Sequence, residues 1–237
     1  QHDLAPFAAR LHDGEADFQR RHAPAAVMPK RRAMDHGIIE LFEFGAALQH
    51  AYDGLPTSFL GFPQRRTSAG EEWRVGVMRT SAFFLRCTGL ARPPATPREW
   101  LTIPEHALAT CTNGKVFSDP LGEFTRWREA LLAHYPEDIR LRKIAALCVT
   151  LAQTGQYDFL RSMKRGELFA AEYSVTKFGA DAIALVFLLN RRYAPFYKWL
   201  HRAVRDLPIL GAAIHELVAR LVQAASTDEK ADLMDRI

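Results

Sequence analysis

The chain has 237 residues, of which 48% are hydrophobic and 24% charged, and its formal net charge is +4. These proportions exclude an intrinsically disordered chain, and the length allows one large domain or two small ones. No apolar run approaches the ~20 residues of a membrane-spanning helix, so we expect no membrane partner. The mild positive charge is compatible with anionic ligands but is too small to indicate nucleic acid.

The cysteines indicate a protein with reduced thiols. Cys87, Cys111 and Cys148 are odd in number and far apart in the sequence, which argues against a disulfide scaffold and excludes a CxxC metal knuckle. The first residues are polar and do not resemble a secretory signal. We therefore expect a cytoplasmic location.

The first half of the chain, up to about residue 125, is interrupted by proline and glycine. Its patterns predict helices at 44–52 and at 97–101, the second with proline in a first turn that tolerates it. Valines alternating with other residues predict a half-buried strand at 74–80. A second strand is predicted at 37–42.

The second half has a clear helical period and predicts four helices. The first begins near Pro136, whose missing N–H costs little at a helix start, and ends at Gly155. The other three are expected at 163–190, 195–206 and 208–224. Segment 178–189 is apolar nearly all round, which is typical of the central helix of a bundle. We expect the charged tail after Ser226 to fray.

Together these elements predict an α+β fold in two parts. A small, partial sheet would form within residues 1–125, and it would pack against a bundle of about four helices formed by residues 126–237.

Three segments combine charged and aromatic residues. Segment 193–199 places tyrosines, a tryptophan and a lysine around a proline corner, which suits a phosphate or base-bearing ligand or the packing of a helix corner. Segment 161–167 has cations beside a glycine and suits an anion or a solvated turn. In segment 117–128, local ion pairing and helix capping are favoured over a site. The candidate substrate-binding residues are Arg161, Arg165, Glu167, Tyr193, Lys198 and Trp199.

These candidates fall on either side of one long predicted helix. From Arg165 to Tyr193 a straight helix would extend about 42 Å at ~1.5 Å per residue. We expect Arg161, Arg165, Tyr193, Lys198 and Trp199 to converge on one cleft. Convergence requires a break, and Gly179 is the only glycine deep enough inside the helix to allow one. Without a break, the segment that ends at Trp199 is the better site.

Several stretches of the chain carry a family resemblance. They are 44–56, 59–63, 75–77, 99–108, 112–117, 119–126, 135–138, 153–157, 165–167, 187–193 and 195–199. Together they resemble a bacterial family of uncharacterised proteins, catalogued as a domain of unknown function, that joins a divergent nucleotidyltransferase-like domain to a helical C-terminal domain. The resemblance implies that residues 1–125 form a partial or degenerate nucleotidyltransferase-like region.

The resemblance also implies a metal site. Nucleotidyltransferases of this type hold Mg²⁺ with two acids one residue apart on a strand and a third acid on a later strand. The start of this chain resembles that acid pair, with Gln1 in place of the first acid and Asp3 as the second. The later strand, 74–79, carries no carboxylate. Asp3 is thus the candidate catalytic residue and metal ligand, at a site that is incomplete and expected to bind Mg²⁺ weakly.

Three hypotheses about function follow. The first is metal-dependent transfer of a nucleotidyl group to a small acceptor. The alternative is a catalytically inactive pseudoenzyme that binds a nucleotide, another small anionic ligand or a partner. The third is an RNA-binding or RNA-cleaving module, for which the only RxxxxH match runs from Arg31 to His36. Nucleic acid is the less favoured partner.

Overall fold

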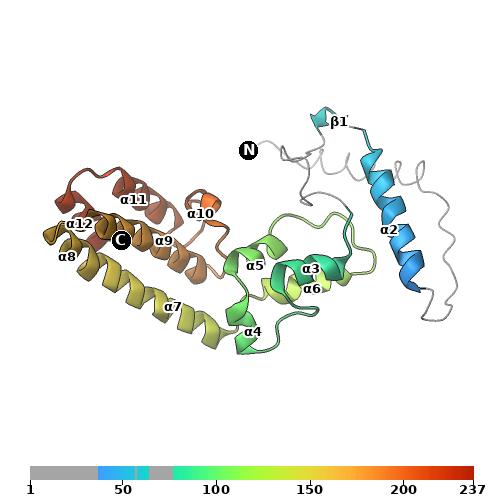
Figure 1. The fold of residues 1–237 in the computed structure, drawn as a ribbon, viewed down its shortest axis with the longest axis horizontal. Coiled ribbons are helices and arrows are strands. Elements are labelled where there is room, and N and C mark those ends of the chain that lie inside the picture. Colours follow the sequence, from blue (N-terminus) through green and yellow to red (C-terminus); the bar gives the residue numbers. More distant parts are fainter. Residues whose placement is uncertain (1–36, 57, 64–76) are drawn as a thin grey trace. The chain divides into compact units, whose positions relative to one another are not determined.

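The computed structural model describes residues 37–56, 58–63 and 77–237 (Figure 1). The chain divides into two compact units, residues 1–77 and residues 78–237, which we describe separately. The domain boundary expected between residues 125 and 126 falls inside a helix of the second unit.

The described part of the first unit contains one helix and one very short hairpin. Helix α2 covers Gly37–Asp53 and includes the helix predicted at 44–52. The strand predicted at 37–42 is wrong, because these residues form the first turns of α2; a short apolar run does not distinguish a strand from a helix. Strands β1 (Ser58–Phe59) and β2 (Phe62–Pro63) pair antiparallel.

The predicted α+β fold with a nucleotidyltransferase-like sheet is wrong for the residues that the structure describes. Their only sheet is the β1–β2 pair, with two residues in each strand. Of the strand predicted at 74–80, residues 77–79 have no regular structure and Thr80 begins a helix, while 74–76 lie outside the described residues. The second unit is built from helices. In its first part, residues 78–125, the frequent prolines and glycines of the sequence had concealed most of them.

The second unit begins with four short helices around an aromatic core. They are α3 (Thr80–Thr88), α4 (Pro97–Thr102), α5 (Glu105–Thr112) and α6 (Glu123–Leu132). Helix α4 confirms the helix predicted at 97–101, and Thr96 and Glu99 form a reciprocal capping box at its start. In the core, Phe84 of α3 stacks on Trp127 of α6 with ring centroids 4.5 Å apart. Aromatic burial therefore holds these short helices together.

The rest of the second unit is a helical bundle. Its elements are α7 (Glu137–Leu151), the π-helix η1 (Ala152–Asp158), α8 (Phe159–Lys164), α9 (Leu168–Leu189), α10 (Tyr197–Val204), α11 (Gly211–Gln223) and α12 (Thr227–Arg236). Helix α9 lies between α7 and α11 (Figure 1) and also contacts α8 and α10. From Phe178 to Leu189 no residue of α9 is exposed, so the prediction of a central helix is confirmed.

Gly155 does not end the helix that contains it. The chain continues from α7 through η1 into α8, so that boundary was predicted wrongly. A Cβ atom at Gly155 would lie 2.7 Å from Cε2 of Phe178, so the glycine allows η1 to approach α9 closely. The chain instead breaks at Gly166, whose φ is +74°, and α9 begins at Leu168.

The C-terminal tail is helical, and the expectation that it frays is wrong. Ser226 caps α12 by accepting a hydrogen bond from the Glu229 N–H at 3.1 Å. Leu233 and Met234 are buried in the same core cluster as Phe159 of α8. Apolar contacts thus outweigh the charged composition of this segment. Among the described residues, no helix is both long enough and apolar enough to cross a membrane.

Gly155 provides a test of the packing between η1 and α9. We expect Gly155→Ala to destabilise the protein by about 1–3 kcal/mol, because the added methyl group overlaps the Phe178 ring. The matched control is Gly179→Ala in α9, where the new Cβ would lie 3.4 Å from Val218. That change should be neutral or stabilising, since alanine favours a helix over glycine. Urea unfolding followed by circular dichroism measures both; equal stabilities of the two variants would contradict the packing argument.

Candidate functional site

The corner between α9 and α10 contains three of the six predicted substrate-binding residues, and the first of them is buried. Tyr193 is only 8% exposed, and its hydroxyl donates a hydrogen bond to the Leu131 carbonyl oxygen at 2.8 Å. Next to it, the Ala194 N–H donates to Oε1 of Glu105 at 3.0 Å. Tyr193 therefore fixes the corner against α5 and α6 and does not face solvent.

The other two residues of the corner are exposed on α10. Lys198 is exposed, and Trp199 is 55% exposed. The Arg202 guanidinium lies 5.4 Å from the centre of the Trp199 ring, within the range of a cation–π interaction. Leu200 and Val204 of the same helix pack into the bundle. Helix α10 thus has a buried apolar side and an exposed side that combines two cations with an indole ring.

The remaining three predicted residues lie at the other end of α9. Arg161 is exposed on α8, with its guanidinium 5.0 Å from the centre of the Tyr157 ring. Arg165 and Glu167 are exposed on the connection between α8 and α9.

The structure does not bring the six predicted residues together. Helix α9 has 22 residues and continues through Gly179, so the break expected there is absent. At ~1.5 Å per residue this helix extends about 33 Å between its ends. Arg165 precedes α9 and Tyr193 follows it, so the predicted residues fall into two groups at opposite ends of this helix.

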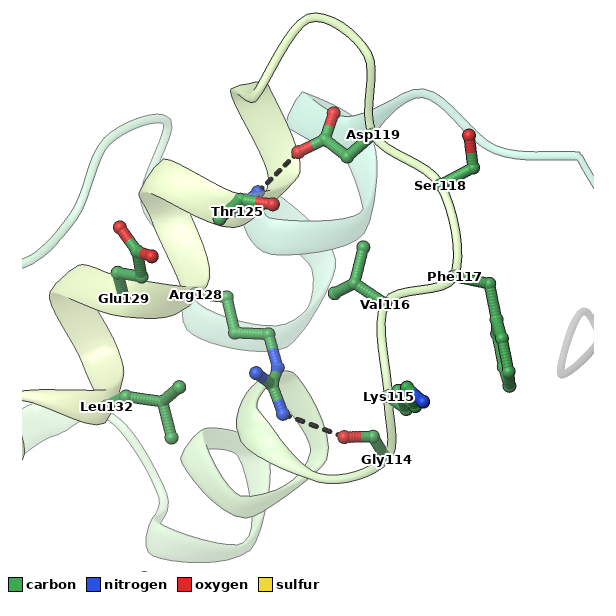
Figure 2. Close-up of a pocket in the computed structure, with 10 residues that line it drawn as sticks. All are labelled: Gly114, Lys115, Val116, Phe117, Ser118, Asp119, Thr125, Arg128, Glu129 and Leu132. Atoms are coloured by element: carbon green, nitrogen blue, oxygen red, sulfur yellow. Dashed lines mark hydrogen bonds between the residues drawn. The ribbon is translucent and has the colours of Figure 1, made fainter. Parts of the chain in front are cut away.

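An open pocket lies between α6 and the segment 114–119, and Figure 2 shows the side chains that line it. Its cavity volume is about 490 Å³. Arg128 donates to the carbonyl oxygens of Thr112 and Gly114, both at 2.8 Å, and the Thr125 N–H donates to Asp119 at 2.7 Å. The hydrogen bond from the Thr125 N–H holds the pKa of Asp119 below its usual value. The local capping predicted for this segment is confirmed, because these polar groups bond to their own loop and helix.

A second, more apolar groove lies between α9, α10 and α11, with a cavity volume of about 290 Å³. Tyr197 and His201 line it from α10. The His201 ring stacks on His215 of α11 at 4.2 Å between centroids, and His201 Nε2 lies 2.8 Å from the His215 carbonyl oxygen. Lys230 and Glu172, which also line the groove, form an ion pair at 2.5 Å.

Sequence reasoning missed a buried polar cluster beneath the corner. His134 is 4% exposed, has a φ of +68°, and stacks on Tyr193 with ring centroids 4.7 Å apart. Neither ring nitrogen of His134 nor the Tyr135 hydroxyl has a hydrogen-bond partner. Glu105 lies nearby, with Oε2 3.6 Å from Lys143. No motif or residue spacing in the sequence singles out His134 as a candidate, because its burial results from tertiary packing.

Burial sets the charge states in this cluster. It lowers the pKa of His134 to about 4, aided by the positive charges of Arg191, Arg140 and Lys143. Burial also raises the pKa of Glu105, although the Ala194 N–H and Lys143 oppose the change. His134 is therefore neutral at pH 7.

Several predictions concern residues outside those described. They are the catalytic and metal-binding role of Asp3 and the Arg31–His36 match. Within the described part of the chain, no group of three or more histidines, cysteines or acidic residues is arranged to hold a metal ion.

Comparison with known proteins supports the expectation of an uncharacterised family. Residues 100–200 match the model of a family described as "Domain of unknown function (DUF4037)". The matched region runs from α4 into α10 and includes both the buried cluster and the corner. No curated protein and no solved structure matches the chain.

His134 should make stability depend on pH. Because its folded pKa is about 4 and its ordinary value is 6.5, the unfolded chain binds the proton more readily between these values. Stability should fall as the pH drops from 6.5 to 4, by at most about 3 kcal/mol from this group. His134→Asn, which tolerates the positive φ, should flatten the curve in urea titrations across this range.

The exposed His106 provides the control, and His106→Asn should keep the wild-type pH dependence. Glu105, with its raised pKa, acts in the opposite direction, so the readout is the difference in slope between variant and wild type. Identical slopes for His134→Asn and wild type would contradict the buried, neutral histidine.

Proposed function

We propose that residues 78–237 form a helical module that binds a nucleotide or another small anionic ligand on the exposed side of α10. The observation that carries this proposal is the contact between the Arg202 guanidinium and the Trp199 ring, on a side of α10 that also carries Lys198. This is the binding alternative of the sequence-based hypotheses.

The chemistry of this surface suits a phosphate joined to an aromatic group. Lys198 provides a compact positive charge, and Arg202 provides a planar fork of donors that matches phosphate oxygens. The exposed indole of Trp199 offers a face on which a base can stack. Lys198 and Trp199 lie in the first turn of α10, so the positive end of the helix dipole adds to the positive potential at this surface.

The anchoring of the corner favours binding without large rearrangement. Tyr193 and Ala194 tie the start of this segment to Leu131 and Glu105, which belong to helices packed in the aromatic core. The exposed side of α10 is therefore held in place before a ligand arrives, and less ordering is required on binding.

Substitutions on α10 test this proposal. Lys198→Ala and Trp199→Ala should each weaken binding of ATP about tenfold, since each removes roughly 1.4 kcal/mol of ion pairing or stacking. Their melting temperatures should stay within about 2 °C of wild type, because both residues are exposed. Isothermal titration calorimetry and thermal unfolding measure the two effects.

Arg165→Ala is the matched control, since it removes an exposed cation at the far end of α9. It should leave ATP binding unchanged. A sharp loss of thermal stability in Lys198→Ala and Trp199→Ala would instead assign these residues to packing, and equal weakening by Arg165→Ala would indicate unspecific charge attraction.

Metal dependence separates this proposal from nucleotidyl transfer. The α10 surface offers no carboxylate, so ATP binding should be weak and equal with and without Mg²⁺. Asp3→Asn should leave the affinity unchanged in the same titrations. Micromolar binding of Mg·ATP that Asp3→Asn abolishes would contradict the proposal and support the metal-dependent transferase.

A further inference from the structure

Two of the three cysteines meet in the fold although 24 positions separate them in the sequence. Cys87 lies in the last turn of α3, and Cys111 lies in the last turn of α5. These two helices pack against each other. Cys111 is only 1% exposed within the aromatic core, and the half-buried Cys87 packs against that core from its edge.

The two thiol groups belong to the same packed region of the core. Burial above all raises the pKa of the Cys111 thiol, and the Cys87 thiol beside it adds to the shift. Cys111 is thus protonated and shielded, whereas Cys87 keeps access to solvent. The third cysteine, Cys148, is exposed on α7 and belongs to neither helix.

We propose that Cys87 and Cys111 are a redox modification site, which a peroxide oxidant converts into a disulfide bond between α3 and α5. The half-buried position of Cys87 makes it the thiol that meets the oxidant, and the buried Cys111 is the resolving thiol. In an otherwise reducing compartment, a disulfide of this kind is transient and senses the redox state.

Oxidation proceeds in two balanced steps. The Cys87 thiolate attacks hydrogen peroxide, the O–O bond breaks, and the products are a sulfenic acid on Cys87 and hydroxide, which takes up the thiol proton as water. The Cys111 sulfur then attacks the Cys87 sulfur. The S–S bond forms as the S–O bond breaks, and the Cys111 proton leaves with the hydroxyl group as a second water. One peroxide is reduced and each cysteine loses one electron.

The disulfide would close a ring of the chain that contains α4. It would also join α3 covalently to α5, the helix that carries Glu105 and so holds the corner before α10. Reduction by a dithiol would restore both free thiols and release this link.

Mass spectrometry of the full chain tests the proposal directly. The reduced protein is treated with increasing hydrogen peroxide, its remaining thiols are alkylated, and it is digested with trypsin without reduction. Cleavage after Arg98 separates the two cysteines, so a disulfide would join peptide Cys87–Arg98 to peptide Glu99–Lys115. We expect this linked pair as the main oxidised product, with dithiothreitol removing it, while Cys148 stays alkylated in peptide Ile144–Arg161.

Variants assign the roles of the two thiols. In Cys111→Ser, Cys87 should stop at the sulfenic acid, which dimedone captures, whereas in Cys87→Ser the buried Cys111 should stay reduced. Cys148→Ser is the matched control and should form the linked pair as wild type does. Circular dichroism checks that each variant folds. The linked peptide pair expected in the wild-type chain tests the proposal even if a variant fails to fold.

Two outcomes would overturn the proposal. One is oxidation of Cys87 to a sulfinic acid while Cys111 remains free in the wild-type chain. The other is a disulfide-linked dimer through Cys148 as the main product on a non-reducing gel.

Discussion

The second unit is organised by the need to bury the C-terminal half of α9 on every side. From Phe178 to Leu189 this helix is apolar around almost its whole circumference, and exposing it would cost roughly 25 cal/mol per Å². Helix α9 as a whole contacts α7, η1, α8, α10 and α11, and its residues Ile183, Val186 and Phe187 pack in one cluster with residues of α10 and α11. The one charged residue in this stretch, Asp181, accepts a hydrogen bond from Thr150 at 2.7 Å and forms an ion pair with Lys177. The buried carboxylate of Asp181 is tolerated because Thr150 and Lys177 satisfy it with a hydrogen bond and an opposite charge.

The straightness of α9 determines where ligands meet the molecule. An unbroken helix of 22 residues separates the basic residues before it from those after it, so no cleft unites them. At its C-terminal end, hydrogen bonds from Tyr193 and Ala194 turn the chain into α10. The apolar side of α10 then completes the cover of α9, and its charged, aromatic side faces solvent. The proposed binding surface is thus a consequence of the same packing.

The short helices α3 to α6 support this arrangement from the other side of the corner. Their aromatic core holds Glu105 and Leu131 in the positions that receive the corner's hydrogen bonds. The same packing buries His134 without hydrogen-bond partners and places Cys87 against Cys111. The pH response expected from His134 and the proposed thiol chemistry therefore both arise in one small region of the fold.

The sequence by itself determined the helices with a strong period, including the central place of 178–189 and the turn into α10, because burial of an apolar side leaves a 3.6-residue pattern. It did not distinguish strand from helix at 37–42, where a short apolar run fits both. Only the tertiary structure decided that Gly155 sits inside a helix against Phe178 and that Leu233 and Met234 order the tail. Only the tertiary structure also decided that Tyr193 is buried, that Trp199 is exposed and that Cys87 and Cys111 share one core, since these outcomes depend on contacts between residues far apart in the chain.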